Sequence, residues 1–167
     1  LTVINDILDL SRIETGKTEL EQKSFDLYAL GDQLRSMFQK TVEAKGLRFH
    51  LEFKNFTVRY VVGDQLRITQ ILLNFLSNAV KFTSHGEISV TFRQMMRTDD
   101  TVSFLVAVKD TGKGMDPKFI TSIFRPFQQE NASIAKTYGG SGLGMAITDQ
   151  LVRLMGGEIG GDSIPGR

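Results

Sequence analysis

The sequence predicts an α+β protein: a two-layer α/β sandwich in which a mixed, mostly antiparallel sheet packs on helices, preceded by one more helical segment. Apolar residues recur at helical spacing in some segments and at every second position in others, and the two kinds interleave with few parallel crossovers. At 167 residues, 41% of them hydrophobic and 23% charged, the chain suits one compact domain with a short appended element.

Composition also narrows the function. A net charge of +1 gives no reason to expect nucleic acid or a membrane surface as a partner. The absence of cysteine excludes disulfides and thiolate metal sites. No apolar run approaches a membrane span and no signal-peptide pattern opens the chain, which starts on Leu1 in mid-pattern. We therefore expect a piece of a longer protein, with any membrane anchor upstream.

Two helices are expected in the first part of the chain. Residues 1 to about 15 carry two adjacent apolar stripes, too wide for a lone surface helix, and Gly16 ends the helix. Phe25 and Asp26 introduce a second helix, which ends at Gly46. The stripe residues are Leu1, Val3, Ile4, Ile7, Leu8 and Leu10 in the first helix and Leu27, Leu30, Leu34, Phe38 and Val42 in the second.

The remaining helices and strands are predicted from the spacing of apolar residues, from polar turns and from the positions of glycines. They are expected, in order, as a strand at 47–54, a helix at 64–82, strands near 87–96 and 102–110 joined by the polar turn 98–100, a short helix after Pro117, an aperiodic polar stretch at 128–137, and a helix that starts after the glycines at 139–144 and ends before Gly156.

The helix at 64–82 carries a polar stripe whose residues are three or four apart and so share one face. Two asparagines one turn apart are unusual in mid-helix, because asparagine is a poor helix former. Amide oxygens on one face can join the oxygen shell of a hard cation, and a neighbouring ammonium can meet phosphate. A solvated surface is the alternative interpretation. The stripe consists of Arg67, Gln70, Asn74, Asn78 and Lys81.

Asp110 ends the strand at 102–110, and by alternation it lies on that strand's apolar side. A carboxylate there needs a committed donor, because an unpaired buried charge is costly. The alternative is an aspartate that caps the turn at Thr111. Gly112 and Gly114 permit a backbone bend with close approach of a flat ligand.

Four glycines lead straight into the last helix. Backbone amides in such a loop, with a helix N-terminus behind them, suit an anionic phosphate chain. A flexible hinge explains a glycine cluster equally well. Neither the Rossmann spacing nor the P-loop fits, since a P-loop ending at Gly112 and Lys113 requires glycine where Ala107 stands. The four glycines are Gly139, Gly140, Gly142 and Gly144.

Taken together and in this order, these segments resemble the catalytic domain of sensor histidine kinases, in the GHKL ATPase superfamily. The resemblance covers nearly the whole chain. The matching segments are NFLSNAVKFT at 74–83 (N box), DTGKGM at 110–115 (first glycine box), IFRPF at 123–127 (F box), GSGLG at 140–144 (second glycine box), GDQLR at 63–67 and DILDLSRIE at 6–14.

The resemblance implies the Bergerat fold of this superfamily and two parts of the chain. Residues 1–16 would be the C-terminal end of the dimerisation and phosphoacceptor helix, and residues 17–167 the ATP-binding catalytic domain, with its closing strand truncated. The family continues past Arg167 into that strand, so we expect an unpaired sheet edge.

The resemblance also implies roles at the matching positions, for ATP and Mg²⁺ as cofactors. Asp110 would hold the adenine amino group, Asn78 would bind magnesium, and Asn74 and Lys81 would be the catalytic residues at the phosphates. Residues 128–141 would form a mobile lid. Phosphoryl transfer needs mostly positioning and charge stabilisation, which such groups provide. The implied nucleotide-binding set is Asn74, Asn78, Lys81, Phe82, Asp110, Gly112, Gly114, Met115, Phe124, Gly140, Ser141, Gly142, Leu143 and Gly144.

The implied activity is that of a protein-histidine kinase, which transfers the γ-phosphoryl group of ATP to a histidine on its own dimerisation domain. The implied partners are that helical domain and the receiver domain of a response regulator, in a homodimeric, membrane-associated sensor whose cytoplasmic part includes this chain. The acceptor histidine is missing, since His50 lies on the polar face of a strand and His85 lies in a turn. We interpret both as surface histidines and expect the chain alone not to phosphorylate itself.

Two other functions remain as alternatives. The first is a GHKL ATPase that hydrolyses ATP to drive a conformational cycle, and the second is a module that binds nucleotide without catalysis. Hydrolysing relatives carry a glutamate one turn before the metal-binding asparagine, as general base for water. Asn74 is a neutral amide that cannot take a proton, so the sequence favours the kinase.

Overall fold

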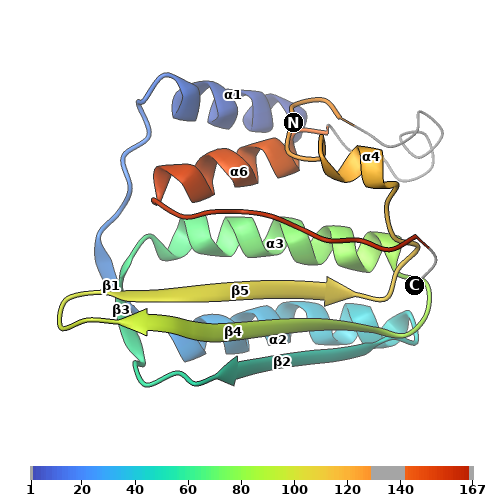
Figure 1. The fold of residues 1–167 in the computed structure, drawn as a ribbon, viewed down its shortest axis with the longest axis horizontal. Coiled ribbons are helices and arrows are strands. Elements are labelled where there is room, and N and C mark those ends of the chain that lie inside the picture. Colours follow the sequence, from blue (N-terminus) through green and yellow to red (C-terminus); the bar gives the residue numbers. More distant parts are fainter. Residues whose placement is uncertain (1, 129–141, 166–167) are drawn as a thin grey trace.

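The computed structural model describes residues 2–128 and 142–165 (Figure 1). Its helices are α1 (Thr2–Glu14), α2 (Leu27–Ala44), α3 (Gln65–Phe82), α4 (Pro117–Ile120) and α6 (Gly144–Leu154). Its strands are β1 (Lys23–Asp26), β2 (Arg48–Lys54), β3 (Tyr60–Gly63), β4 (Glu87–Arg97) and β5 (Val102–Asp110). Every helix and strand that the periodicity predicts is confirmed, and the last helix includes the glycine at its start. Strands β1 and β3 were not predicted.

The strands form two sheets where the sequence predicted one. In the larger sheet β4 is central, parallel to β2 and antiparallel to β5. Strands β1 and β3 pair antiparallel in a separate two-stranded sheet. The larger sheet is mixed, as expected. Among the strands that the structure describes, β5 has β4 as its only partner.

The main core lies between the larger sheet and the helices α2 and α3 that cover one of its faces (Figure 1). The aromatic rings of Phe53 and Phe92 stack within it, with their centroids 4.6 Å apart. Side chains that are fully buried there come from α2, α3 and β4 and include Leu27, Leu30, Leu34, Leu76, Ile88, Val90 and Phe92.

A second apolar cluster joins α1 to α6. Helix α6 packs on α3, and α1 packs on α6 on the side away from the sheet (Figure 1). The wide apolar face of α1 divides accordingly, because one edge packs on α6 and the other stays exposed. Ile13 is buried with α6 residues, whereas Ile4 is 61% exposed and Leu8 is 51% exposed. None of the helices in the described part of the chain is long and apolar enough to cross a membrane.

Candidate functional site

The polar stripe of α3 is half-buried against other helices, which contradicts the solvated alternative. Its first part contacts α1. Gln70 Nε2 donates to Asp9 Oδ2 (3.2 Å), and Arg67 Nη1 donates to Gln70 Oε1 (2.8 Å) and lies 3.7 Å from Asp9 Oδ2. Arg67 and Gln70 therefore belong to the contact with α1 and not to a ligand site.

The middle of the stripe contacts the start of α6. Asn74 Nδ2 donates to Thr148 Oγ1 (2.8 Å) and to Met145 Sδ (3.4 Å), and Asn78 Nδ2 donates to the same sulfur (3.5 Å). A Cβ at Gly144 would lie 2.5 Å from Asn74 Oδ1, so only glycine fits there without a shift. The side-chain N–H groups of both asparagines thus donate to α6, and their side-chain oxygens can bind other partners.

The chemistry of these oxygens suits a magnesium ion. Within the described residues Asn78 Oδ1 accepts no hydrogen bond, and no group of three His, Cys, Asp or Glu residues could hold a metal. Magnesium is commonly bound by one or two protein oxygens together with substrate phosphates, and does not need an all-protein cage. The available donor set fits an ion that arrives with a phosphorylated ligand.

Asp110 is held by one of its two carboxylate oxygens. Oδ1 accepts from Thr83 Oγ1 (3.2 Å) and from the backbone N–H of Gly112 (2.8 Å). Asp110 therefore has the hydrogen-bond donors that the sequence required. The bond from Gly112 N–H lies within the turn and corresponds to the turn-capping alternative. The residue is solvent-exposed at the end of β5, and within the described part of the chain Oδ2 accepts no hydrogen bond. This second oxygen can accept from a ligand.

Two glycines follow Asp110, and neighbouring atoms of the chain leave no room for a side chain at either position. A Cβ at Gly112 would lie 2.6 Å from Asp110 Oδ1 and 2.7 Å from the carbonyl oxygen of Phe82. Gly114 has φ +71°, and a Cβ there would lie 2.4 Å from the carbonyl oxygen of Ile164. The sequence assigned both glycines to a ligand's approach, and the structure shows that neighbouring atoms of the chain also require glycine at both positions. The next residue, Met115, donates its N–H to Ser163 Oγ (2.8 Å).

Positive charge gathers at the C-terminal end of α3. The ammonium groups of Lys81 and Lys113 lie 5.0 Å and 5.5 Å from the centroid of the Phe82 ring. Such an arrangement places two ammonium groups beside one aromatic ring. Sequence reasoning singled out Lys81 and Phe82 but missed Lys113. It also missed the roles of Thr83, Met145 and Thr148, of which only Thr83 carries a sequence signal, as the end of the N box.

Other predicted residues have different surroundings. Leu143 is fully buried with Ile13 and neighbouring α6 residues, so its side chain belongs to the core and only its backbone can face a nucleotide. Gly142 has φ +68° and its carbonyl oxygen accepts from Phe127 N (3.0 Å). Phe124 is half-buried after α4. Gly139, Gly140, Ser141 and all of the expected lid except Gln128 lie outside the described residues.

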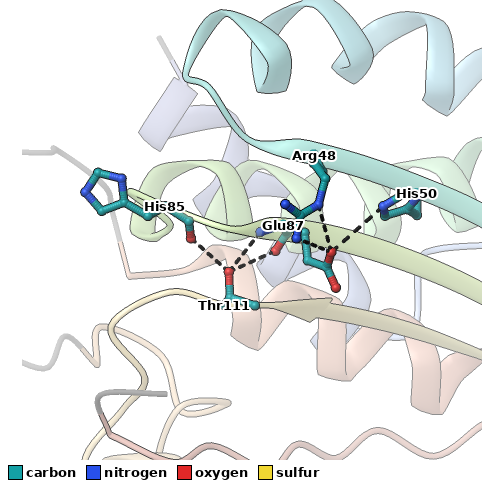
Figure 2. Close-up of polar contacts among 5 residues, drawn as sticks. All are labelled: Arg48, His50, His85, Glu87 and Thr111. Carbon is teal, nitrogen blue, oxygen red and sulfur yellow. Dashed lines mark hydrogen bonds and ion pairs between the residues drawn. The ribbon is translucent and has the colours of Figure 1, made fainter.

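The two histidines are exposed on the surface, as predicted, and Figure 2 shows their contacts. The His50 side chain is 60% exposed, and its Nε2 lies 3.9 Å from Glu87 Oε2, which Arg48 Nη2 contacts at 3.0 Å. His85 takes part through its backbone carbonyl, which accepts from Thr111 Oγ1 (2.9 Å), while its ring points away from these residues (Figure 2). Neither ring contacts the asparagines or Asp110.

Comparison with known proteins agrees with this geometry. Residues 63–167 match the family of histidine kinase-, DNA gyrase B-, and HSP90-like ATPases. The signal transduction histidine-protein kinase BarA of Escherichia coli K12 is 38% identical over 167 residues, which are 100% of this chain and 18% of BarA. The crystal structure of full-length ShkA in complex with AMPPNP is 31% identical, with a TM-score of 0.75, over 97% of this chain and 33% of that one. Histidine kinase ThkA, in complex with the response regulator protein TrrA, is 26% identical, with a TM-score of 0.61, over 77% of this chain and 36% of that one.

The chain therefore belongs to the histidine kinase-, DNA gyrase B-, and HSP90-like ATPase family. Within that family its relatives are sensor histidine kinases, and its fold is that of their ATP-binding catalytic domains, as the N box and the glycine boxes predicted. It spans 18% of BarA and 33% of ShkA.

Proposed function

We propose that this chain is the part of a two-component sensor kinase that binds Mg²⁺ and ATP and donates the γ-phosphoryl group to a histidine on a dimerisation domain. The observation that supports this most is that one helix, α3, joins both ends of the site. Its C-cap residue, Thr83, contacts Asp110, and Asn74 in its middle contacts the start of α6. These contacts are about 13 Å apart along the axis, at about 1.5 Å per residue, which is a span suited to an extended nucleotide.

The Asp110 end takes adenine in this proposal. Asp110 Oδ2 accepts from the exocyclic amino group, while Oδ1 remains committed to Thr83 and Gly112. A carboxylate has only acceptor oxygens, so it selects a base edge that carries a donor. The backbone at Gly112 and Gly114 then lines the base, with Met115 and Phe124 as further contacts.

The α6 end takes the phosphates. The first N–H groups of α6 have no partner within the helix, and the helix dipole adds positive potential there. Gly142 and Gly144 allow the backbone to approach the phosphates, together with Gly140 and Ser141. When bound, Mg²⁺ neutralises developing charge on the phosphates, with Asn78 Oδ1 as its protein ligand. Asn74 and Lys81 position the phosphate chain.

The partners follow from the same proposal. Residues 1–16 are the end of the dimerisation helix, and the exposed Ile4 and Leu8 on α1 offer an apolar edge to further helices of that domain. ThkA is seen in complex with a response regulator protein, which supports a receiver domain as the second partner. We propose that the full protein is a homodimer associated with a membrane and that this chain lies in its cytoplasmic part.

The first test measures binding and transfer together. Calorimetric titration with a non-hydrolysable ATP analogue, with and without magnesium, should show binding that magnesium strengthens. Radiolabelled ATP should leave the chain alone unlabelled and should give acid-labile label on an added helical hairpin that carries an acceptor histidine. Failure of the folded chain to bind the analogue would contradict the proposal. Acid-labile label on the chain alone that is lost in His50→Gln or His85→Gln would contradict the assignment of the histidines.

The metal role of Asn78 has its own test. Asn78→Ala removes the amide oxygen, so the magnesium dependence of binding should vanish while the affinity measured in EDTA persists. Ser77→Ala, at the exposed neighbouring position of α3, is the matched control. A magnesium response in Asn78→Ala equal to that of the unmodified chain would show that Asn78 does not bind the ion.

A further inference from the structure

The side chain of Lys45 connects the end of α2 to the end of α3. Lys45 is the C-cap residue of α2, and its Nζ donates to the carbonyl oxygens of Val80 (2.5 Å) and Thr83 (3.2 Å). The last carbonyls of a helix have no partner within the helix, and a cation beside them meets the negative end of the helix dipole. Lys45 therefore supplies hydrogen-bond donors to the carbonyl oxygens at the end of α3, although it belongs to another element.

The turn that Lys45 holds is the one that contacts Asp110. Thr83 is fully buried, its N–H donates to the carbonyl oxygen of Ala79 (3.0 Å), and its Oγ1 donates to Asp110 Oδ1 (3.2 Å). The carbonyl oxygen of the preceding residue accepts from the N–H of Lys113 (3.4 Å), in the turn that follows Asp110. A change in the backbone of this turn would therefore move the donor that orients the Asp110 carboxylate.

We propose that Lys45 is a positioning residue that sharpens the selection of adenine, acting through Thr83 on Asp110. The proposal rests on the role proposed above for Asp110. Neither Val80 nor Thr83 belongs to the set expected to contact nucleotide, so Lys45 acts on the turn and not on the ligand. No motif of the sequence analysis includes Lys45.

Selection of adenine in this proposal depends on one hydrogen bond, from the amino group of the base to Asp110 Oδ2. Adenine presents an amino donor to Asp110 Oδ2, whereas hypoxanthine carries a carbonyl oxygen at the same position, which a carboxylate repels. Discrimination of this kind depends on a fixed acceptor, because a carboxylate free to rotate can turn away from the wrong base. Loss of the Lys45 contact should therefore lower the preference for adenine as well as the affinity.

The experiment measures dissociation constants for ADP and IDP by calorimetry on the whole chain. The variants are Lys45→Met, Lys45→Arg, Thr83→Val and the double variant Lys45→Met with Thr83→Val. Lys40→Met is the matched control, since Lys40 is an exposed lysine of the same helix with no polar partner among the described residues. Thermal unfolding of each variant shows that it is folded at the temperature of the titration.

We expect Lys45→Met to bind ADP about three- to tenfold more weakly, the scale of one lost hydrogen bond, and to lose ADP-over-IDP preference by a similar factor. Lys45→Arg should restore most of the preference because a guanidinium also donates to carbonyl oxygens. Lys40→Met should change neither value. In the Thr83→Val background, Lys45→Met should have less than about a twofold effect, because the link is already cut.

Several results would overturn the inference. One is an unchanged ADP-over-IDP preference in folded Lys45→Met. Another is an unchanged preference in Thr83→Val, which cuts the link without altering Lys45 and so decides the matter even if Lys45→Met does not fold. A full effect of Lys45→Met in the Thr83→Val background is a third. An unmodified chain that binds no ADP would instead overturn the proposed function, and this inference with it.

Discussion

Replacing Asp110 by asparagine tests the adenine assignment sharply, because the structure separates the two carboxylate oxygens. Oδ1 accepts from Thr83 Oγ1 and from Gly112 N, at 3.2 Å and 2.8 Å, and an asparagine can keep its carbonyl oxygen in that place. Its amino group then replaces Oδ2 and presents a donor to the donor of adenine. Because the side chain is exposed and both internal hydrogen bonds can persist, the free energy of unfolding should change by less than about 0.5 kcal/mol.

Nucleotide binding should change far more than stability. A polar group left without its partner costs about 1–3 kcal/mol, and about 1.4 kcal/mol is tenfold in Kd. We therefore expect Asp110→Asn to bind an ATP analogue about 5- to 150-fold more weakly by calorimetry. Asp99→Asn, in the β4–β5 turn at the opposite end of β5, removes the same charge away from the site and serves as control. Unchanged affinity in Asp110→Asn, or an equal loss in Asp99→Asn, would refute the reasoning.

Two further predictions concern stability. Gly144→Ala places a Cβ 2.5 Å from Asn74 Oδ1, so the Asn74 amide or the start of α6 must shift, and urea unfolding should show a loss of about 1–3 kcal/mol. Gly161→Ala, with nothing within 4 Å of its Cβ, should show no loss. The Arg59 guanidinium and the first N–H groups of α2 lower the pKa of Asp26. A lowered pKa in the folded state gives stability that is present above the unfolded pKa and is lost as pH falls through the folded value. Asp26→Asn should thus be less stable than the unmodified chain at neutral pH, and the difference should shrink as the pH falls through the acid range. A stability difference that stays constant with pH would contradict this reasoning.

The elements that sequence predicts well here are those with several periods of pattern. Helices α2 and α3 show their stripes over 18 residues each, and β4 and β5 are long enough for alternation to be plain. Strands β1 and β3 have four residues each, too few for a period, and they pair across α2 and β2. Their partners are fixed by the tertiary fold, which a local pattern does not contain.

For the candidate site too, the local pattern predicts some features, and only the tertiary structure shows the others. Alternation placed Asp110 on the apolar side of its strand, but its exposure follows from its position as the last residue of β5. Helical spacing put Asn74 and Asn78 on one face, yet only the structure shows that Met145 and Thr148 of α6 occupy their N–H groups. These contacts join residues about seventy positions apart, so no local signal could have announced them.

The surroundings of Asn74 favour transfer to histidine over hydrolysis. Attack by water needs a base within hydrogen-bond reach, whereas transfer to an imidazole needs alignment of a nucleophile that the partner supplies. Within the described residues the amide of Asn74 contacts a thioether and a hydroxyl, from Met145 and Thr148, and neither takes a proton at neutral pH. Bound ATP should therefore persist, and phosphate release by the chain alone should stay close to the uncatalysed rate. Steady phosphate release that disappears in Asn74→Ala would show that this position activates water after all, and would favour the ATPase over the kinase.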